Sequence, residues 1–240
     1  MSRDIKGCVT GSALLKYFDE KSDIDIFCYD QASFLKLYYE MYYDPMFQIL
    51  DKIELWKAQQ IMTKDFFINK HFTGVTSLKF TYNTCINLNI VLKKGYDNVF
   101  AVLSSFDINL VCKAYDLSTK KYLDLTEGST ESKIVNYNSW NPAFLSTEIW
   151  QISRILRQME RIIKYHKRGY NTDAVVLKYI ELIDRLEEYK SIFKSETFNE
   201  KLKTLQTNTA SLKKICELWL KTHTITDKEL ELLQLKIKEL

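Results

Sequence analysis

The chain has 240 residues, 46% of them hydrophobic, which is enough for one large globular domain or two small ones with separate cores. Its 34 Lys and Arg residues against 31 Asp and Glu residues give a net charge of +3, too small to indicate a nucleic-acid-binding protein by itself. No stretch approaches the roughly 20 apolar residues of a membrane-spanning helix, and the N-terminus lacks an apolar signal core. We therefore expect a cytoplasmic protein without a membrane partner.

The first quarter of the chain alternates short strands with helices. Hydrophobic patterning predicts a strand over 5–10, a helix over 12–18 and a buried strand over 24–29. A helical pattern then extends from residue 31 to about residue 61, and Pro45 interrupts it because proline removes a helical hydrogen bond.

Extended segments dominate the next part. The runs 77–82 and 85–92 predict an antiparallel hairpin across a two-residue turn. A short helix is expected over 97–105. The alternation over 107–117 predicts another strand, with which 121–125 can pair.

The period changes to that of amphipathic helices from residue 146 onward. Further helices are expected over 173–193, 196–222 and 227–240. Asn141-Pro142 punctuates the boundary, so we expect one domain over 1–140 and an all-helical domain over 141–240. The predicted fold class is α+β: a mixed β-sheet with flanking helices, followed by helices alone.

Two acidic residues stand out at the start of the predicted strand over 24–29. Asp23 and Asp25 are one residue apart and point to the same face, while Ile24 faces the core, so the two carboxylates can hold a divalent metal together. Upstream, Gly11 lets the backbone approach a ligand closely. The amides at the start of the following helix, with the Ser12 hydroxyl, form an anion site for triphosphate oxygens.

The order of these residues resembles the signature of the polymerase-beta-type nucleotidyltransferase superfamily. That signature is a hydrophobic residue, Gly and Gly or Ser, a spacer of about ten residues, then Asp, a hydrophobic residue and Asp or Glu. The resemblance implies a nucleotidyltransferase-like N-terminal domain, magnesium or manganese as cofactor, and ATP or another nucleoside triphosphate as substrate. Motifs of other enzyme classes, such as GxGxxG, a Walker-type loop or GxSxG, are absent from the sequence.

In that superfamily a third carboxylate on a later strand completes a two-metal site, and here the sequence leaves a choice. Asp107 is the first candidate, at a predicted strand entrance, although it also suits a turn between helix and strand. Asp116 is the reserve candidate. The predicted strand 86–90 looks like the place where some relatives carry the third acid, but it offers only Asn87 and Asn89.

A basic cluster with interleaved aromatic residues lies at 161–170 and includes Lys164 and Arg168. Such a cluster can hold phosphates or stack a base. Together with the run 106–116, it also looks like nucleotidyltransferase-like proteins of phages and large DNA viruses. The alternative is a helix C-terminus favoured by cations and capped by Gly169. The histidines fit no metal-ligand pattern and are expected to be structural or exposed: His71, His166 and His223.

The resemblance thus implies a metal-dependent enzyme that moves a nucleoside monophosphate to an acceptor hydroxyl. Its implied catalytic and metal-binding residues are Asp23, Asp25 and Asp107, and its nucleotide-binding residues are Gly11, Ser12, Lys164 and Arg168. RNA, a protein, a second nucleotide and a small molecule remain open as acceptors, and the basic cluster favours RNA. Two other classes stay open: a nucleotide-binding module without turnover, and a helical interaction protein such as one half of a toxin–antitoxin pair.

Overall fold

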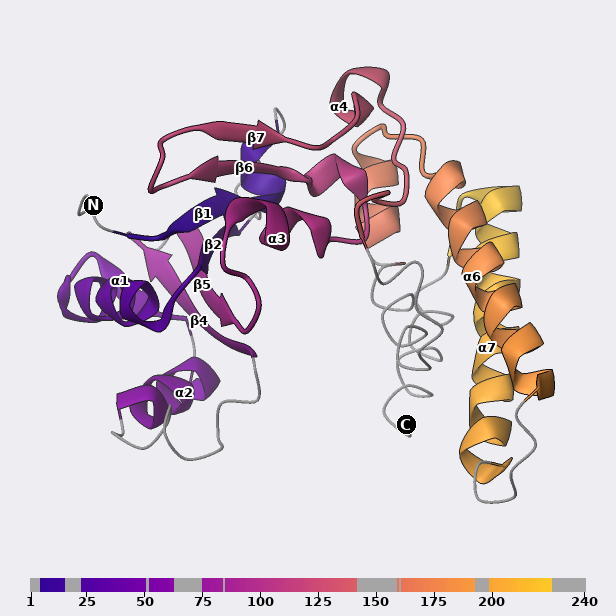
Figure 1. The fold of residues 1–240 in the computed structure, drawn as a ribbon, viewed down its shortest axis with the longest axis horizontal. Coiled ribbons are helices and arrows are strands. Elements are labelled where there is room, and N and C mark those ends of the chain that lie inside the picture. The colour runs from indigo at the N-terminus through magenta and orange to yellow at the C-terminus, as the bar shows by residue number, and fades with distance from the viewer. Residues whose placement is uncertain are drawn as a thin grey trace. The chain divides into compact units, whose positions relative to one another are not determined.

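The structure, a computed structural model, divides the chain into two compact units, Met1–Glu127 and Gly128–Leu240. It describes residues 5–15, 23–50, 52–62, 75–83, 85–141, 159, 161–192 and 199–225. Within these residues the fold is mixed α/β, with one sheet and several helices (Figure 1). None of the helices in this part of the chain is both long and apolar enough to cross a membrane.

A seven-stranded mixed sheet forms the centre of the first unit. Its strands follow one another in space in the order β3-β4-β5-β2-β1-β6-β7. Strands β2 and β5 pair in parallel, whereas the other neighbouring pairs are antiparallel. The strand bounds are β1 (Gly7–Thr10), β2 (Ile24–Cys28), β3 (Phe47–Ile49), β4 (Val75–Tyr82), β5 (Ile86–Lys93), β6 (Lys113–Asp116) and β7 (Tyr122–Asp124).

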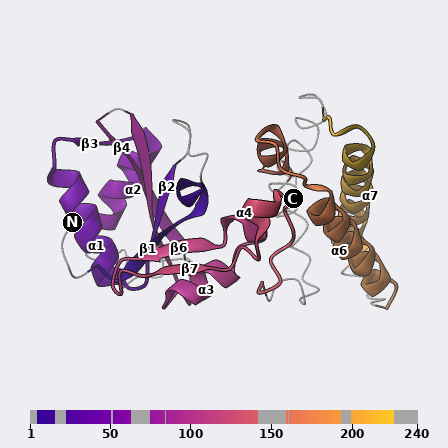
Figure 2. The ribbon, with the colours of Figure 1, turned by 90° about the horizontal axis from the view of Figure 1, so that it is seen from above.

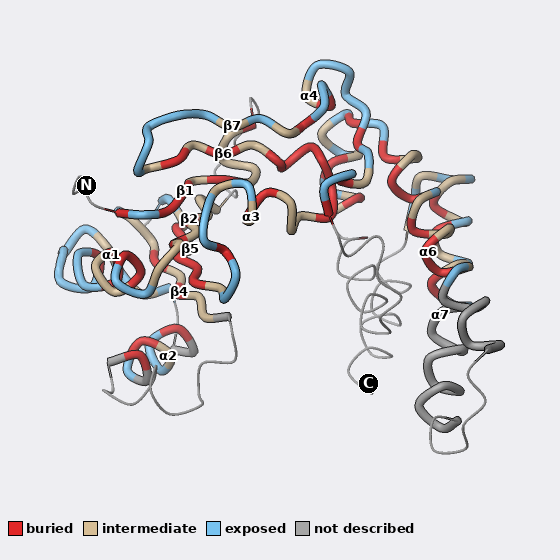
Figure 3. The backbone as a smooth tube through the Cα atoms, in the orientation of Figure 1, coloured by how far each residue is buried: buried red, intermediate tan, exposed pale blue. Residues whose placement is uncertain are grey.

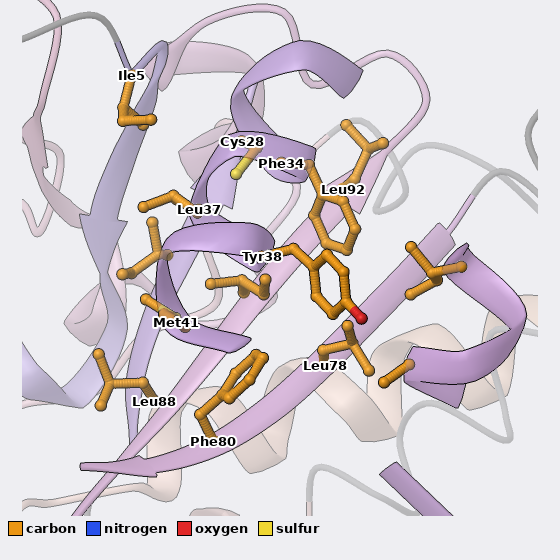
Figure 4. Close-up of a cluster of buried hydrophobic side chains, with 14 residues drawn as sticks. Ile5, Cys28, Phe34, Leu37, Tyr38, Met41, Leu78, Phe80, Leu88 and Leu92 are labelled. Carbon is orange, nitrogen blue, oxygen red and sulfur yellow. The ribbon is translucent and has the colours of Figure 1, made fainter. Parts of the chain in front are cut away.

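Two helices, α1 (Gln31–Tyr43) and α2 (Lys52–Met62), pack against one face of this sheet. Because strand side chains alternate between faces, every second residue of β2, β4 and β5 contributes to the same core. Figure 4 shows how the apolar side chains of α1 meet those of the strands. The labelled members of this cluster are Ile5, Cys28, Phe34, Leu37, Tyr38, Met41, Leu78, Phe80, Leu88 and Leu92.

The opposite face of the sheet carries a smaller core beneath α3 (Val99–Ser104). Cys8 of β1 and Ala114 of β6 are buried in it, and Phe27 of β2 packs against it. Two residues away along β1 and β2, the same face presents Thr10 and Asp25 instead of apolar side chains. One end of this face is therefore apolar and the other polar.

Several elements of the first unit agree with the sequence patterns. Strand β2 and the β4–β5 hairpin are confirmed. Helix α3 is confirmed as well, and it begins where the Asn98 side chain accepts a hydrogen bond of 2.9 Å from the Ala101 amide. The predicted pairing of 121–125 with the preceding strand is confirmed by the antiparallel contact of β6 and β7.

Tertiary pairing changes one predicted element. The helical pattern over 31–61 is two helices separated by β3, which follows Pro45 and pairs antiparallel with β4. Pairing of Phe47–Ile49 with a strand that lies far along the chain outweighs the local helical pattern.

Two further predictions are wrong in their details. The expected α-helix over 12–18 is, in its described part, the short 3-10 turn η1 (Gly11–Leu14), and residues 16–18 lie outside the described part. The expected strand over 107–117 begins only at Lys113, because the preceding residues form the 3-10 turn η2 (Asn109–Val111). The buried Asn109 side chain stabilises this turn by donating a hydrogen bond of 3.1 Å to the Thr126 carbonyl.

The second unit contains α4 (Ser129–Ser132), helical residues 161–167, α6 (Asp173–Ile192) and α7 (Asn199–Thr222) (Figure 2). Figure 3 shows a buried stripe along α6, which contacts α7. Among the residues of these two helices whose burial the structure describes, the buried apolar ones are Val175, Val176, Tyr179, Leu182, Ile183, Leu212, Cys216 and Trp219. Helices predicted before residue 159 and over 227–240 fall outside the described residues.

The two units divide at Glu127, earlier in the chain than the residue 140 that the sequence indicates. Residues 133–135 belong with the second unit because they pair with Asn171. The Val135 amide donates to the Asn171 carbonyl at 2.8 Å, and the Asn171 amide donates to the Lys133 carbonyl at 2.7 Å. The Asn141-Pro142 pair therefore lies inside the second unit.

Candidate functional site

The register of four strands aligns four polar residues on the sheet face opposite α1 and α2. Thr10 of β1 pairs with Asp25 of β2, Asp25 pairs with Asn89 of β5, and Asn89 pairs with Lys79 of β4. We call Thr10, Asp25, Asn89 and Lys79 the polar row. All four lie in the first unit, so the row is formed entirely within one compact body.

The carboxylate of Asp25 is held between two neighbours. On one side, the Asn89 side-chain amide donates a hydrogen bond of 3.0 Å to Asp25 Oδ1. On the other side, a Cβ atom added at Gly11 would lie 3.0 Å from Asp25 Oδ2. Gly11 also has a φ of +82°, a backbone conformation that residues with a Cβ atom rarely adopt. Gly11 therefore makes room for Asp25 itself, which the sequence did not indicate.

Asp23 points to the same face as the polar row. Its Oδ2 atom lies 3.7 Å from Lys79 Nζ, so Asp23 and the row share one ion pair. The side chain between the two acids, Ile24, packs against the opposite core, as expected for alternating strand residues. The structure thus brings Asp23 and Asp25 to a common face.

Lys79 is held through its backbone at the point where β3 ends. Its amide donates a hydrogen bond of 3.0 Å to the buried Glu54 carboxylate of α2, and its carbonyl accepts one of 3.2 Å from the Leu50 amide. The other oxygen of Glu54 accepts from Lys57 at 2.6 Å. Glu54 therefore continues the hydrogen bonding of the sheet edge and fixes the position from which the Lys79 side chain extends.

Thr10 serves the site through the sheet. It is fully buried, and its hydroxyl donates a hydrogen bond of 2.7 Å to the Lys113 carbonyl of β6. This contact closes the β1–β6 pairing next to Asp25. Thr10 therefore stabilises the sheet beside Asp25.

The oxygen atoms at this site suit a hard cation. Two carboxylates, Asp23 and Asp25, face the same side, and the buried Asn89 Oδ1 has no hydrogen-bond partner among the described residues. Carboxylate and amide oxygens are the ligands that magnesium and manganese prefer. The donor set fits such an ion with two acids and one amide.

A third acid is not grouped with them. In the part of the chain that the structure describes, no three His, Cys, Asp or Glu side chains are grouped so that they could hold a metal ion. Asp107 is buried between α3 and η2, and it precedes a 3-10 turn instead of entering a strand. Asp23, Asp25 and Asp107 therefore do not form a three-carboxylate centre within this part of the chain.

The reserve candidate, Asp116, has a structural role. Its carboxylate accepts hydrogen bonds of 2.9 Å and 2.7 Å from the amides of Ser118 and Thr119, and one of 2.8 Å from the Tyr29 hydroxyl. Burial alone would raise the pKa of Asp116, but the hydrogen bonds from Thr119, Tyr29 and Ser118 outweigh it and hold the pKa below its usual value. The carboxylate therefore stabilises the β6–β7 turn.

The basic cluster belongs to the second unit. Lys164 is exposed, and the Arg168 guanidinium lies 6.0 Å from the centre of the Tyr165 ring. Gly169 has a φ of +84°, and its amide donates to the His166 carbonyl at 2.8 Å, as expected of a glycine that ends a helix. The capping interpretation of this segment is thus confirmed, while phosphate binding by Lys164 and Arg168 stays a prediction.

Two histidines that are distant in sequence come together in the second unit. The rings of His166 and His223 stack in parallel at 5.0 Å, and Trp219 packs edge-on against both. His223 Nε2 lies 2.8 Å from Asp173 Oδ1. These contacts join the ends of three helical segments, which fits the structural role expected of both histidines.

Sequence reasoning missed Lys79 as a member of the site and treated Asn89 only as a substitute for an acid. Neither residue belongs to a motif, and both join Asp25 only through the pairing of β4, β5 and β2. The alternating polar residues of the hairpin strands were the only signal. No protein-family model matches the chain, and a search of curated proteins finds no match either.

Proposed function

We propose that this chain is a magnesium- or manganese-dependent nucleotidyltransferase. It would transfer a nucleoside monophosphate from ATP or another nucleoside triphosphate to an acceptor hydroxyl. The observation that carries the proposal is the setting of Asp25, which lies between Gly11 and Asn89 with Asp23 turned to the same face. The Gly-Ser segment lies in η1, directly after β1, and the Asp-Ile-Asp segment lies at the start of β2, which pairs with β1. Ten residues separate the two segments in sequence.

Asp23 and Asp25 would hold the divalent ion, with Asn89 Oδ1 as the neighbouring neutral oxygen. When bound, such an ion supplies charge for the phosphate oxygens and lowers the pKa of an acceptor hydroxyl. The protein's own residues prepare this site. The Asn89 side-chain nitrogen donates to Asp25 Oδ1 and orients this carboxylate, and Gly11 leaves space for Asp25 Oδ2, so the acid needs little rearrangement on binding.

Candidate contacts to the nucleotide outside the metal site lie in η1 and in the basic cluster. Ser12 lies in η1, directly after Gly11, and its hydroxyl is a candidate donor to a phosphate oxygen. A four-residue 3-10 turn provides no helix dipole, so anion binding by a helix N-terminus is not part of the proposal. Lys164 and Arg168 of the basic cluster stay candidate phosphate-binding residues. Because they are cations among aromatic rings, they favour RNA over a protein hydroxyl as the acceptor.

A second candidate, nucleotide binding without turnover, is favoured by one observation. The position next to Asp25 on β5 is occupied by Asn89, so a neutral amide stands where a third carboxylate would complete the site. A site with two acids carries less negative charge for metal ions than a site with three. This difference would weaken catalysis more than it weakens nucleotide binding.

The test uses the purified full chain with each labelled nucleoside triphosphate, magnesium or manganese, and total cellular RNA and protein. Wild type, Asp25→Asn and the control Asp97→Asn are compared, since Asp97 is an exposed acid in the same unit. We expect label on a macromolecule with wild type and Asp97→Asn, and none with Asp25→Asn.

Equal labelling by Asp25→Asn would refute the site. If wild type transfers no label and releases no pyrophosphate, yet binds nucleotide in a magnesium-dependent way, the second candidate is correct.

A further inference from the structure

Lys79 is the one basic side chain of the polar row. Its Nζ atom lies 3.7 Å from Asp23 Oδ2, and both side chains are partly exposed, at 42% for Lys79 and 37% for Asp23. An ion pair with this exposure is weak and exchanges readily, because water screens it and both side chains gain freedom when it opens. Lys79 can therefore leave Asp23 at little cost.

The backbone of Lys79 holds the strand in place, while its side chain is not needed for this. The strand is held at this position by the hydrogen bonds that join the Lys79 backbone to Glu54 and Leu50. The four-carbon stem is flexible and carries a compact ammonium with three donors. Only this ammonium, and no part of the strand's hydrogen bonding, has to move when Asp23 takes another partner.

The charges around Lys79 require such a movement if a metal binds. Asp23 is an expected metal ligand, so a divalent cation there would meet the Lys79 ammonium as a like charge. A nucleoside triphosphate that arrives with the metal brings several negative oxygens to the same face. The displaced ammonium would then have a better partner than the one it lost.

We propose that Lys79 is the triphosphate-binding residue of the polar row, held on Asp23 without ligand and transferred to a phosphate oxygen when a divalent cation takes Asp23. This proposal rests on the proposed function, because it needs Asp23 and Asp25 to bind the metal. It also assigns a role to β4, which no sequence motif marks. Lys79 thus competes with the metal alone and assists the metal–nucleotide complex.

Two opposite effects on equilibrium binding follow for Lys79→Met. Manganese alone should bind about two- to fivefold more tightly, the range expected when one exposed ion pair no longer competes for Asp23. The magnesium complex of α,β-methylene ATP should bind about tenfold more weakly or worse, since a charge-assisted hydrogen bond to phosphate is lost. Lys79→Arg should recover most of the nucleotide affinity, because it keeps the positive charge.

A matched control is available in the same sheet. Lys113 of β6 forms an ion pair of 3.0 Å with Asp124, but it neighbours Ala114 and so points to the face opposite the polar row. Lys113→Met should leave both affinities unchanged. A purely structural effect of losing a lysine would instead appear in both variants.

The experiment measures manganese binding by electron paramagnetic resonance and nucleotide binding by calorimetry, with Asp25→Asn included. Opposite shifts in Lys79→Met, absent from Lys113→Met, support the proposal. Unchanged affinities in Lys79→Met, or losses of both, overturn it, while abolished metal binding in Asp25→Asn leaves the proposed function intact. If Asp25→Asn binds manganese as wild type does, the metal site itself is refuted, and this proposal with it.

Discussion

Replacing Gly11 by alanine tests how closely Asp25 is held. At a φ of +82°, an alanine costs about 1–2 kcal/mol of backbone free energy, because its Cβ approaches the following carbonyl oxygen. The new Cβ would also lie 3.0 Å from Asp25 Oδ2, so the carboxylate has to shift by a few tenths of an ångström. Gly11→Ala should therefore lower both stability and metal affinity.

A second glycine separates these two effects. Gly95 has a φ of +85°, but a Cβ there would meet no atom within 4 Å. Gly95→Ala therefore carries the same kind of backbone strain without touching the site. Both variants should lose about 1–2 kcal/mol, or roughly 3–10 °C in Tm. Only Gly11→Ala should also lose manganese affinity, by about 10- to 100-fold, as is typical when the support of a metal ligand is disturbed.

The assays are thermal unfolding, followed by circular dichroism, and manganese binding, followed by electron paramagnetic resonance. Wild-type manganese affinity in Gly11→Ala would refute the argument that Gly11 makes room for Asp25. An equal loss of affinity in Gly95→Ala would refute it as well, because backbone strain far from the site would then account for the effect.

Three further predictions concern the site, the sheet edge beside Lys79 and the β6–β7 turn. Asn89→Asp places a third carboxylate beside Asp25, so this variant should bind manganese several-fold more tightly. Because the acids repel one another, its Tm should be lower than that of wild type without manganese and should recover when manganese is added. A Tm that does not respond to manganese would contradict this prediction. Glu54→Ala removes the carboxylate that accepts hydrogen bonds from the Lys79 amide and the Lys57 side chain. The free energy of unfolding in urea should fall by about 2–3 kcal/mol. A fall of less than about 0.5 kcal/mol would show that the sheet edge is stable without Glu54. Because the pKa of Asp116 is lowered in the folded state, its ionised carboxylate increases the free energy of unfolding above pH 3.8, the ordinary pKa value. This stabilisation is lost as the pH falls through the folded pKa. Asp116→Asn should thus lower Tm at pH 7 and progressively less below pH 3.8, and a Tm difference that does not change with pH would disprove the assignment.

The sequence patterns correctly predicted the helices and strands that depend on residues close together in the chain. The apolar run of β2, the extended runs of β4 and β5 and the helical pattern of α3 depend on neighbouring residues, and each element forms close to where the patterns indicated. The placement of Asp23 and Asp25 on one face also follows from alternation alone, because Ile24 between them has to be buried.

Elements with distant causes were harder to predict. Strand β3 forms inside a helical pattern because β4, far along the chain, offers it hydrogen-bonding partners. Residues 107–111 alternate like a strand, yet the buried Asn109 side chain binds the Thr126 carbonyl and keeps them in a turn. Asp107, chosen for its place before that expected strand, precedes a 3-10 turn for this reason.

The sequence by itself determined the two acids, the glycine before them and the strands that carry them. Tertiary structure alone decided their neighbours. Asn89 and Lys79 join Asp25 through the parallel pairing of β2 with β5 and the register of the β4–β5 hairpin. A shift of one residue in either pairing would turn one of these side chains to the opposite face. Such a register depends on how the whole sheet packs, and no local pattern of residues contains it.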